Sequence, residues 1–128
     1  MNLNHINIIV KDVNHAVNLF IKHLGFSLIV NRNSKMAVLE NGNHFALVIW
    51  GQELNHKENV PAYPDNFHIG FYQKNELAVW EIYEKLKTEA NLSFESEPKK
   101  IRNTFGFYFF FEKLMIEISI TPFQDNVA

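Results

Sequence analysis

The segment His5-Ile6-Asn7-Ile8 decides the fold, because a degenerate copy of it returns as His68-Ile69-Gly70-Phe71. Each copy is followed by a similar amphipathic run, Ala16-Val17-Asn18-Leu19-Phe20 in the first half and Ala78-Val79-Trp80-Glu81-Ile82 in the second. This repetition indicates a duplicated module. Because the two copies share one design, their leading histidines can be aimed at one point near the axis that relates them, which is the geometry of a metal site.

Hydrophobic periodicity predicts a strand, a helix and three more strands in the first half. Apolar residues alternate along 3–10, and after Asp12 they follow a helical stripe that Gly25 is well placed to end. The remaining β-rich runs cover 26–31, 35–40 and 44–50, the last two joined by the turn sequence Asn41-Gly42-Asn43. We therefore expect a βαβββ module over residues 1–50.

The second half repeats this order after a linker. Residues 51–66 carry charges, amides and two prolines, which predicts a segment that runs over the surface. Strands are then predicted at 67–73, 92–95, 104–111 and 114–120, with a helix that Asn75 caps and that ends near Asn91. We expect a second βαβββ module over 67–121 and a tail over 122–128, all within one domain.

Composition excludes several classes of function. The chain has 128 residues, 47% of them hydrophobic and 14% aromatic, which is ample for a packed core. Its formal charge of -2 gives no electrostatic footprint for nucleic acid or a membrane, so we expect a small-molecule or protein partner. The lack of cysteine excludes thiolate ligands and disulfides, and it is compatible with the reducing cytoplasm, where we expect the protein.

Strand parity gathers several polar side chains on one sheet face. In the last strand Ile116 and Ile118 must face the helix, which leaves Glu117 on the other face. The same reasoning places His68 and His5 on that other face, together with Asn7, Gly70, Tyr72 and Ser119. In the first module the position that corresponds to Glu117 is occupied by Val48.

Two neutral imidazoles and one carboxylate on a concave face form a three-ligand metal site. Such a set suits Zn, Fe, Mn, Ni or Co and leaves positions open for water or substrate. A carboxylate within an apolar strand is also costly unless it is paired with a cation. The candidate ligands are His5, His68 and Glu117. The alternative is a solvated face on which these three are ordinary polar residues.

The sequence resembles the vicinal oxygen chelate superfamily. The resemblance rests on the early His-Ile pair, the first helix from Ala16 to Phe20, His23-Leu24-Gly25-Phe26 after it, the second histidine strand, and Ile116-Glu117-Ile118 near the end. This group includes glyoxalase I, fosfomycin-resistance thiol transferases, methylmalonyl-CoA epimerase, extradiol dioxygenases and bleomycin-resistance proteins. The likeness covers nearly the whole chain.

The resemblance implies an α+β fold in which two βαβββ modules form a cupped mixed sheet, and a homodimer. It implies a divalent metal on His5, His68 and Glu117 that acts as a Lewis acid on a small molecule with adjacent oxygens. Val48 stands where some members carry a fourth ligand, which argues against a standard glyoxalase I. No catalytic side chain is assigned.

Further residues are candidates for contact with the substrate. They are polar or aromatic and share the predicted face or its rim: Asn7, Trp50, Tyr72, Arg102, Tyr108 and Ser119. In relatives the region of Lys99, Lys100 and Arg102 often contacts anionic substrate groups, although it also fits a solvated basic loop.

The predicted function is that of a metal-dependent, glyoxalase- or dioxygenase-like enzyme. The alternative is a metal-free binding protein of the bleomycin-resistance type, which would use the same cup to sequester a flat or hydrophobic molecule. A third reading is a subunit or regulatory protein with vestigial ligands. Metal content distinguishes the first of these from the other two.

Overall fold

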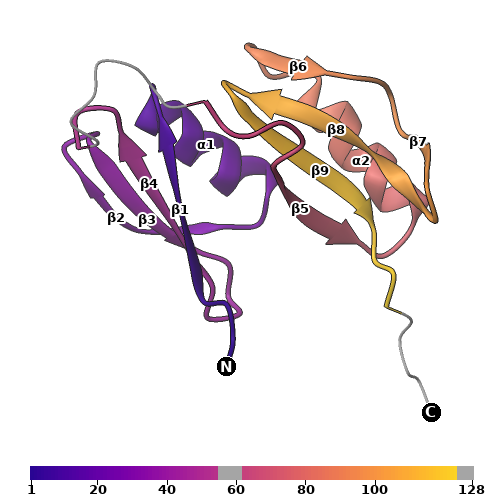
Figure 1. Cartoon of the computed structure of the whole chain (residues 1–128), viewed down its shortest axis with the longest axis horizontal. Coiled ribbons are helices and arrows are strands. Elements are labelled where there is room, and N and C mark those ends of the chain that lie inside the picture. Colours follow the sequence, from indigo (N-terminus) through magenta and orange to yellow (C-terminus); the bar gives the residue numbers. More distant parts are fainter. Residues whose placement is uncertain (55–61, 124–128) are drawn as a thin grey trace. The chain divides into compact units, whose positions relative to one another are not determined.

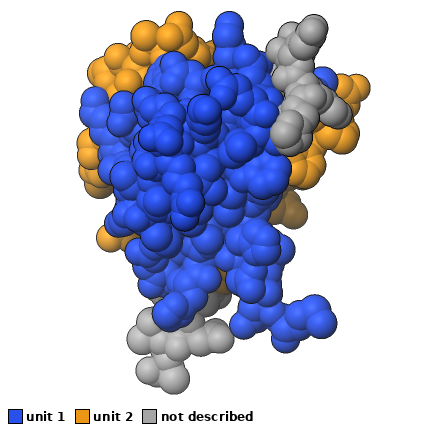
Figure 2. All heavy atoms as spheres, turned by 90° about the vertical axis from the view of Figure 1, so that its left-hand side faces the viewer, with its two compact units in different colours: residues 1–62 blue, residues 63–128 orange. Residues whose placement is uncertain are grey.

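The computed structural model describes residues 1–54 and 62–123 (Figure 1). The chain divides into two compact units, Met1–Ala62 and Tyr63–Ala128, which Figure 2 distinguishes by colour. Each unit holds one mixed sheet and one helix, so the predicted α+β fold of two related modules is confirmed. Residues 55–61 of the predicted linker and most of the predicted tail lie outside the described residues.

The first unit forms a sheet in the order β1-β4-β3-β2, with one helix against one face (Figure 1). Its elements are β1 (His5–Val10), α1 (Val13–His23), β2 (Ser27–Arg32), β3 (Met36–Glu40) and β4 (Ala46–Gly51). The Asp12 carboxylate accepts a hydrogen bond from the His15 amide at 3.0 Å and so begins the helix. Gly25 follows the helix with a φ of +78°, which glycine adopts without strain.

The second unit forms a sheet in the order β5-β9-β8-β6, and β7 pairs with β8. Its elements are β5 (His68–Gln73), α2 (Glu76–Leu86), β6 (Leu92–Phe94), β7 (Lys99–Ile101), β8 (Thr104–Phe111) and β9 (Leu114–Ile120). Asn75 caps α2 by accepting a hydrogen bond from the Ala78 amide at 2.9 Å. The core under α2 is aromatic, with Tyr83 and Phe107 ring centroids 5.1 Å apart in an edge-to-face contact.

Two predictions about the second unit are wrong in detail. The helix ends at Leu86 rather than near Asn91, because the amides of Thr88 and Glu89 turn back three residues to Lys85 and Leu86 and tighten the chain. Asn91 does have a φ of +68°, but it lies in the connection to β6. The segment interpreted as a basic loop contains β7, whose three residues pair with the start of β8.

The register of the two sheets confirms that Val48 corresponds to Glu117. In the first unit β1 and β4 are parallel, with His5 beside Ala46 and Asn7 beside Val48. In the second unit β5 and β9 are also parallel, with His68 beside Met115 and Gly70 beside Glu117. The two central strand pairs therefore match residue for residue.

The predicted strand parity also holds in the second unit. Ile116 and Ile118 of β9 are completely buried, whereas Glu117 between them is half-buried on the opposite face. Among the described residues, α1 and α2 are the helices, and neither is long and apolar enough to cross a membrane.

Candidate functional site

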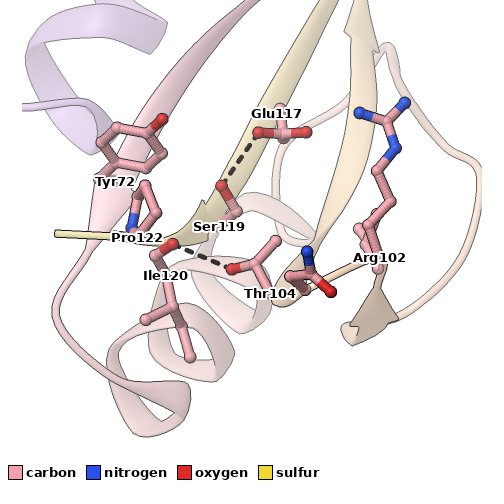
Figure 3. Close-up of a pocket in the computed structure, with 9 residues that line it drawn as sticks. Tyr72, Arg102, Thr104, Glu117, Ser119, Ile120 and Pro122 are labelled. Carbon is pink, nitrogen blue, oxygen red and sulfur yellow. Dashed lines mark hydrogen bonds between the residues drawn. The ribbon is translucent and has the colours of Figure 1, made fainter.

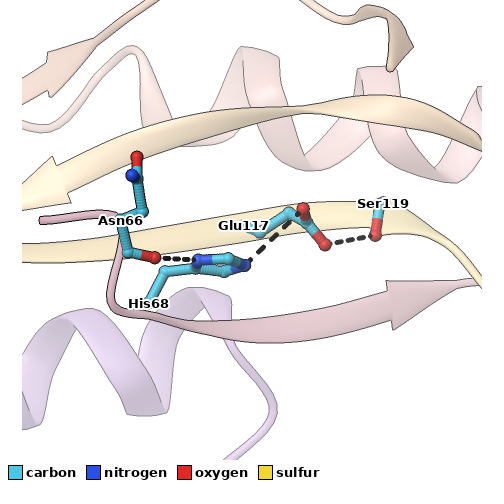
Figure 4. Close-up of polar contacts among 4 residues, drawn as sticks. All are labelled: Asn66, His68, Glu117 and Ser119. Atoms are coloured by element: carbon cyan, nitrogen blue, oxygen red, sulfur yellow. Dashed lines mark hydrogen bonds and ion pairs between the residues drawn. The ribbon is translucent and has the colours of Figure 1, made fainter. Parts of the chain in front are cut away.

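Neighbouring parallel strands bring His68 and Glu117 together. His68 begins β5 and Glu117 lies at the centre of β9, one row further along the same sheet face. The His68 Nε2 atom lies 3.8 Å from Glu117 Oε1 (Figure 4). The side chains are 32% and 17% exposed, so water reaches the imidazole while the carboxylate is largely shielded.

A backbone carbonyl fixes the proton position on the His68 ring. The Nδ1 atom lies 2.8 Å from the carbonyl oxygen of Asn66, which can only accept a hydrogen bond, so Nδ1 carries a proton (Figure 4). In the neutral ring Nε2 is then unprotonated and faces a carboxylate oxygen. Two electron-rich atoms in this arrangement attract a cation between them.

Two donors orient the Glu117 carboxylate. The hydroxyl of Ser119 donates to Oε2 at 3.0 Å, and Ser119 is only 1% exposed. Tyr108, opposite Glu117 on β8, donates a side-chain hydrogen bond to the carboxylate. This hydrogen bond, followed by burial, raises the pKa of Tyr108 above its ordinary value, so the phenol stays protonated at neutral pH.

Gly70 leaves open space beside this carboxylate. A Cβ atom at Gly70 would lie 3.6 Å from Glu117 Oε2, in contact with the group that the site depends on. The Tyr108 ring closes the other side, with its centroid 5.5 Å from that of His68 in an edge-to-face contact. The carboxylate therefore has an open side and two fixed donors.

These residues fit a divalent metal. Two ligand atoms that each lie about 2.1 Å from one ion can be at most about 4.2 Å apart, and the His68 and Glu117 atoms meet this limit. A metal-binding histidine ordinarily donates its other ring N–H to a carbonyl or carboxylate, as His68 does to Asn66. Within the described residues of either unit, no group of three His, Asp or Glu side chains forms.

The third predicted ligand, His5, begins β1 of the first unit. Its Nδ1 atom lies 2.7 Å from the side-chain oxygen Oδ1 of Asn4, so this ring too donates from Nδ1 and keeps Nε2 as its acceptor. Both predicted histidine ligands therefore have the same tautomer, each fixed by an oxygen close by in the sequence. That His5 joins His68 and Glu117 involves both units and stays a prediction.

A hollow of about 240 Å³ adjoins Glu117 in the second unit (Figure 3). Three of the predicted substrate contacts line it, namely Tyr72, Arg102 and Ser119. Tyr108 contacts Glu117 instead, while Asn7 on β1 and Trp50 on β4 belong to the first unit. Lys99 and Lys100 do not line this hollow.

Sequence reasoning missed several residues of this site. Thr104 lines the hollow, and strand parity with Tyr108 was a signal that could have found it. Asn103 and Pro122 line it from a turn and from the chain after β9, where no periodicity points to a face. The carbonyl of Asn66 has no sequence signal at all, because every residue carries one.

The fold is that of a two-module α+β protein, and the sheet of its second module carries a polar hollow beside Glu117. The family model described as the Glyoxalase/Bleomycin resistance protein/Dioxygenase superfamily matches residues 2–120. The chain belongs to this superfamily.

Solved structures agree with this assignment. A possible glyoxalase from Bacillus cereus is 29% identical, with a TM-score of 0.76 over 92% of this chain and 97% of that one. The fosfomycin resistance protein FosX from Mesorhizobium loti shares the fold at 16% identity and a TM-score of 0.74, over 99% and 98%. Lactoylglutathione lyase from Agrobacterium tumefaciens also shares the fold, at 10% identity and a TM-score of 0.68, over 93% of this chain and 92% of that one. No curated protein matches the sequence.

Proposed function

We propose that this protein is a metal-dependent enzyme that acts on a small molecule with adjacent oxygens. Its metal ligands in this proposal are His5, His68 and Glu117. The observation that carries the proposal is the pair of atoms His68 Nε2 and Glu117 Oε1, 3.8 Å apart, with the proton of the imidazole held on Nδ1. A divalent cation bound there would supply Lewis acidity for a carbonyl, enediolate or similar oxygen pair.

The chain's own residues have distinct roles in this proposal. Ser119 donates to Oε2 of Glu117 and Tyr108 donates to the same carboxylate, so the two donors would hold the carboxylate in one orientation toward the cation. Asn66 keeps His68 in the tautomer that a ligand needs. Since the Tyr108 phenol stays protonated, it acts as a hydrogen-bond donor rather than as a base.

The remaining predicted contacts complete the proposal for the substrate. Tyr72, Arg102 and Ser119 would bind it from the hollow beside Glu117, and Asn7 and Trp50 from the first module. We also propose that the protein works in the cytoplasm and that it is a homodimer. Light scattering of the purified protein tests the oligomeric state.

Metal content is the decisive measurement. Protein purified without a histidine tag should carry, or take up at neutral pH, about one Zn, Fe, Mn, Ni or Co per chain by elemental analysis. The variant Glu117→Gln keeps the shape of the side chain but loses the charge, and it should bind the metal about 100-fold more weakly or worse. The matched control Glu97→Gln changes an exposed glutamate outside the site and should bind as the parent does.

Two results would contradict the proposal. One is a folded protein that takes up no metal at neutral pH, which would favour the metal-free binding module. The other is equal metal affinity in Glu117→Gln and Glu97→Gln, since it would mean that the carboxylate on β9 is not a ligand.

A further inference from the structure

The turn between β3 and β4 carries a motif that the candidate metal site does not use. Its sequence is Asn41-Gly42-Asn43, and Asn41 is the one asparagine of the sequence that a glycine follows. Asn41 is half-buried, whereas Gly42 is exposed and has a φ of +84°. A Cβ atom built on Gly42 would meet no described residue within 4 Å apart from its chain neighbours. The amide nitrogen of Gly42 therefore lies in open surroundings, with no side chain of its own residue over it.

Glu40 places a base at this nitrogen. Its carboxylate oxygen Oε2 accepts a hydrogen bond from the Gly42 amide at 2.7 Å. A charged acceptor at this distance draws the amide proton toward itself and raises the electron density on the nitrogen. Within the described residues Glu40 makes no ion pair, so no cation competes with the amide for the carboxylate.

The amide of Asn43 activates the side chain of Asn41. It donates a hydrogen bond to Oδ1 of Asn41 at 3.0 Å, which polarises the carbonyl and makes Cγ more electrophilic. This hydrogen bond closes a small ring that contains both Cγ of Asn41 and the nitrogen of Gly42, so the side chain is folded back over the turn. The amide of Asn41 itself donates to the Phe45 carbonyl at 3.2 Å and holds the turn closed.

We infer that Asn41 is a site of self-catalysed deamidation, in which Glu40 is the base and the Asn43 amide stabilises the charge that develops on Oδ1. The Gly42 nitrogen forms a bond to Cγ of Asn41 and gives its proton to the Glu40 carboxylate. The tetrahedral carbon then expels the side-chain amino group, which takes up that proton and leaves as ammonia. Water opens the resulting succinimide at either of its carbonyls and gives aspartate or isoaspartate.

The product differs from the parent in the first module. Each conversion adds one negative charge beside Glu40, and isoaspartate also lengthens the main chain of the turn by one methylene group. None of the residues of this turn lines the hollow beside Glu117. The inference is therefore independent of the proposed function, and the metal content of the protein does not bear on it.

The test follows the full chain at neutral pH over several weeks, by tandem mass spectrometry of the tryptic peptide that begins at Met36. Digestion in water labelled with heavy oxygen identifies conversion during handling. Asn41 should be converted faster than Asn43 in the same peptide. In Glu40→Gln the new amide can still accept the hydrogen bond but is not a base, so conversion of Asn41 should be about tenfold slower or more. Circular dichroism shows whether the variant is folded.

The matched control is Glu53→Gln, which removes the same charge from an exposed glutamate of the same unit. Asn41 should be converted in this variant as fast as in the parent. Three results would overturn the inference: an Asn41 that stays intact in the folded parent, an equal rate in the parent and Glu40→Gln, or the same slowing in both variants.

A second measurement separates the structure of the turn from its sequence. Guanidinium chloride unfolds the chain and screens the charge of Glu40, while the sequence Asn41-Gly42 remains. The ratio of the rates in the parent and in Glu40→Gln should then fall to about one. A ratio that is the same in the folded and the unfolded chain would mean that the contacts of the folded turn are not the cause, and it would overturn the inference.

Discussion

The two modules share one backbone plan but differ at the centre of the sheet face opposite the helix. In the first module Val48 of β4 lies beside Val38 of β3. In the second module the same two positions are Glu117 and Tyr108, which are hydrogen-bonded to each other. A pair of apolar side chains in one copy is thus an ionisable pair in the other.

This difference shows which residues specify the fold and which remain open to chemistry. Leu47 and Ile49 in β4, and Ile116 and Ile118 in β9, are almost completely buried against their helices and fix the register of each sheet. Because a strand exposes alternate residues on opposite faces, the residues between them can change without disturbing that core. The leading histidine is the polar feature that both copies keep.

The largest effect is expected for the two leading histidines, and the test asks whether both of them are metal ligands. His5→Ala and His68→Ala should each weaken metal binding about 100-fold or more, because each removes one ligand of a three-ligand site. Isothermal titration with the metal found in the purified protein measures both. His15→Ala, on the helix of the first module, should bind as the parent does.

If His68→Ala loses metal affinity and His5→Ala does not, the two leading histidines have different roles. The second module would then hold the cation without the first, and His5 would be a remnant of the duplication.

The next largest effect is expected when the residues at the equivalent positions Val48 and Glu117 are exchanged between the modules, and it concerns stability. Val48→Glu should lower the free energy of unfolding by about 1–3 kcal/mol, because the new carboxylate is half-buried beside Val38 and lacks the two donors that Tyr108 and Ser119 give to Glu117. The triple variant Glu117→Val with Tyr108→Phe and Ser119→Ala should be at least as stable as the parent, since it removes a carboxylate together with both of its donors. Urea unfolding curves at pH 7 measure both.

Binding of a second ion by Val48→Glu would contradict this view. It would show that the repeated backbone and its histidine are enough to build a site, without the partners that Tyr108 and Ser119 provide in the second module.

The sequence predicted the features that depend on periodicity. Alternation along β9 and β5 placed Glu117 and His68 on one face, and the structure brings their side chains to within 3.8 Å. The caps at Asp12 and Asn75 also form as expected, because each side-chain oxygen accepts a hydrogen bond from an amide that the first helical turn leaves unpaired.

The features that escaped prediction depend on backbone groups and on close packing. The carbonyl of Asn66 fixes the His68 tautomer, yet it follows from a φ of +66° that no residue pattern announces. The hollow beside Glu117 follows from the approach of two strands at Gly106, which becomes visible only when β8 and β9 are paired. Pattern reasoning assigns faces, but it does not assign distances across them.

The smallest expected effect concerns the hydroxyl that distinguishes Tyr108 from Val38. Tyr108→Phe keeps the ring against His68 but removes the donor to Glu117, so metal affinity should fall about tenfold, as for a residue that supports a ligand. Because the pKa of Tyr108 is raised, the phenol donates at every pH from 6 to 9, and the tenfold difference should be constant over that range. The control is Tyr72→Phe, which changes an exposed tyrosine of β5 and should bind metal as the parent does. A difference between Tyr108→Phe and the parent that vanishes as the pH rises toward 9 would mean that the phenol loses its proton there, and that Glu117 does not hold it as the structure indicates.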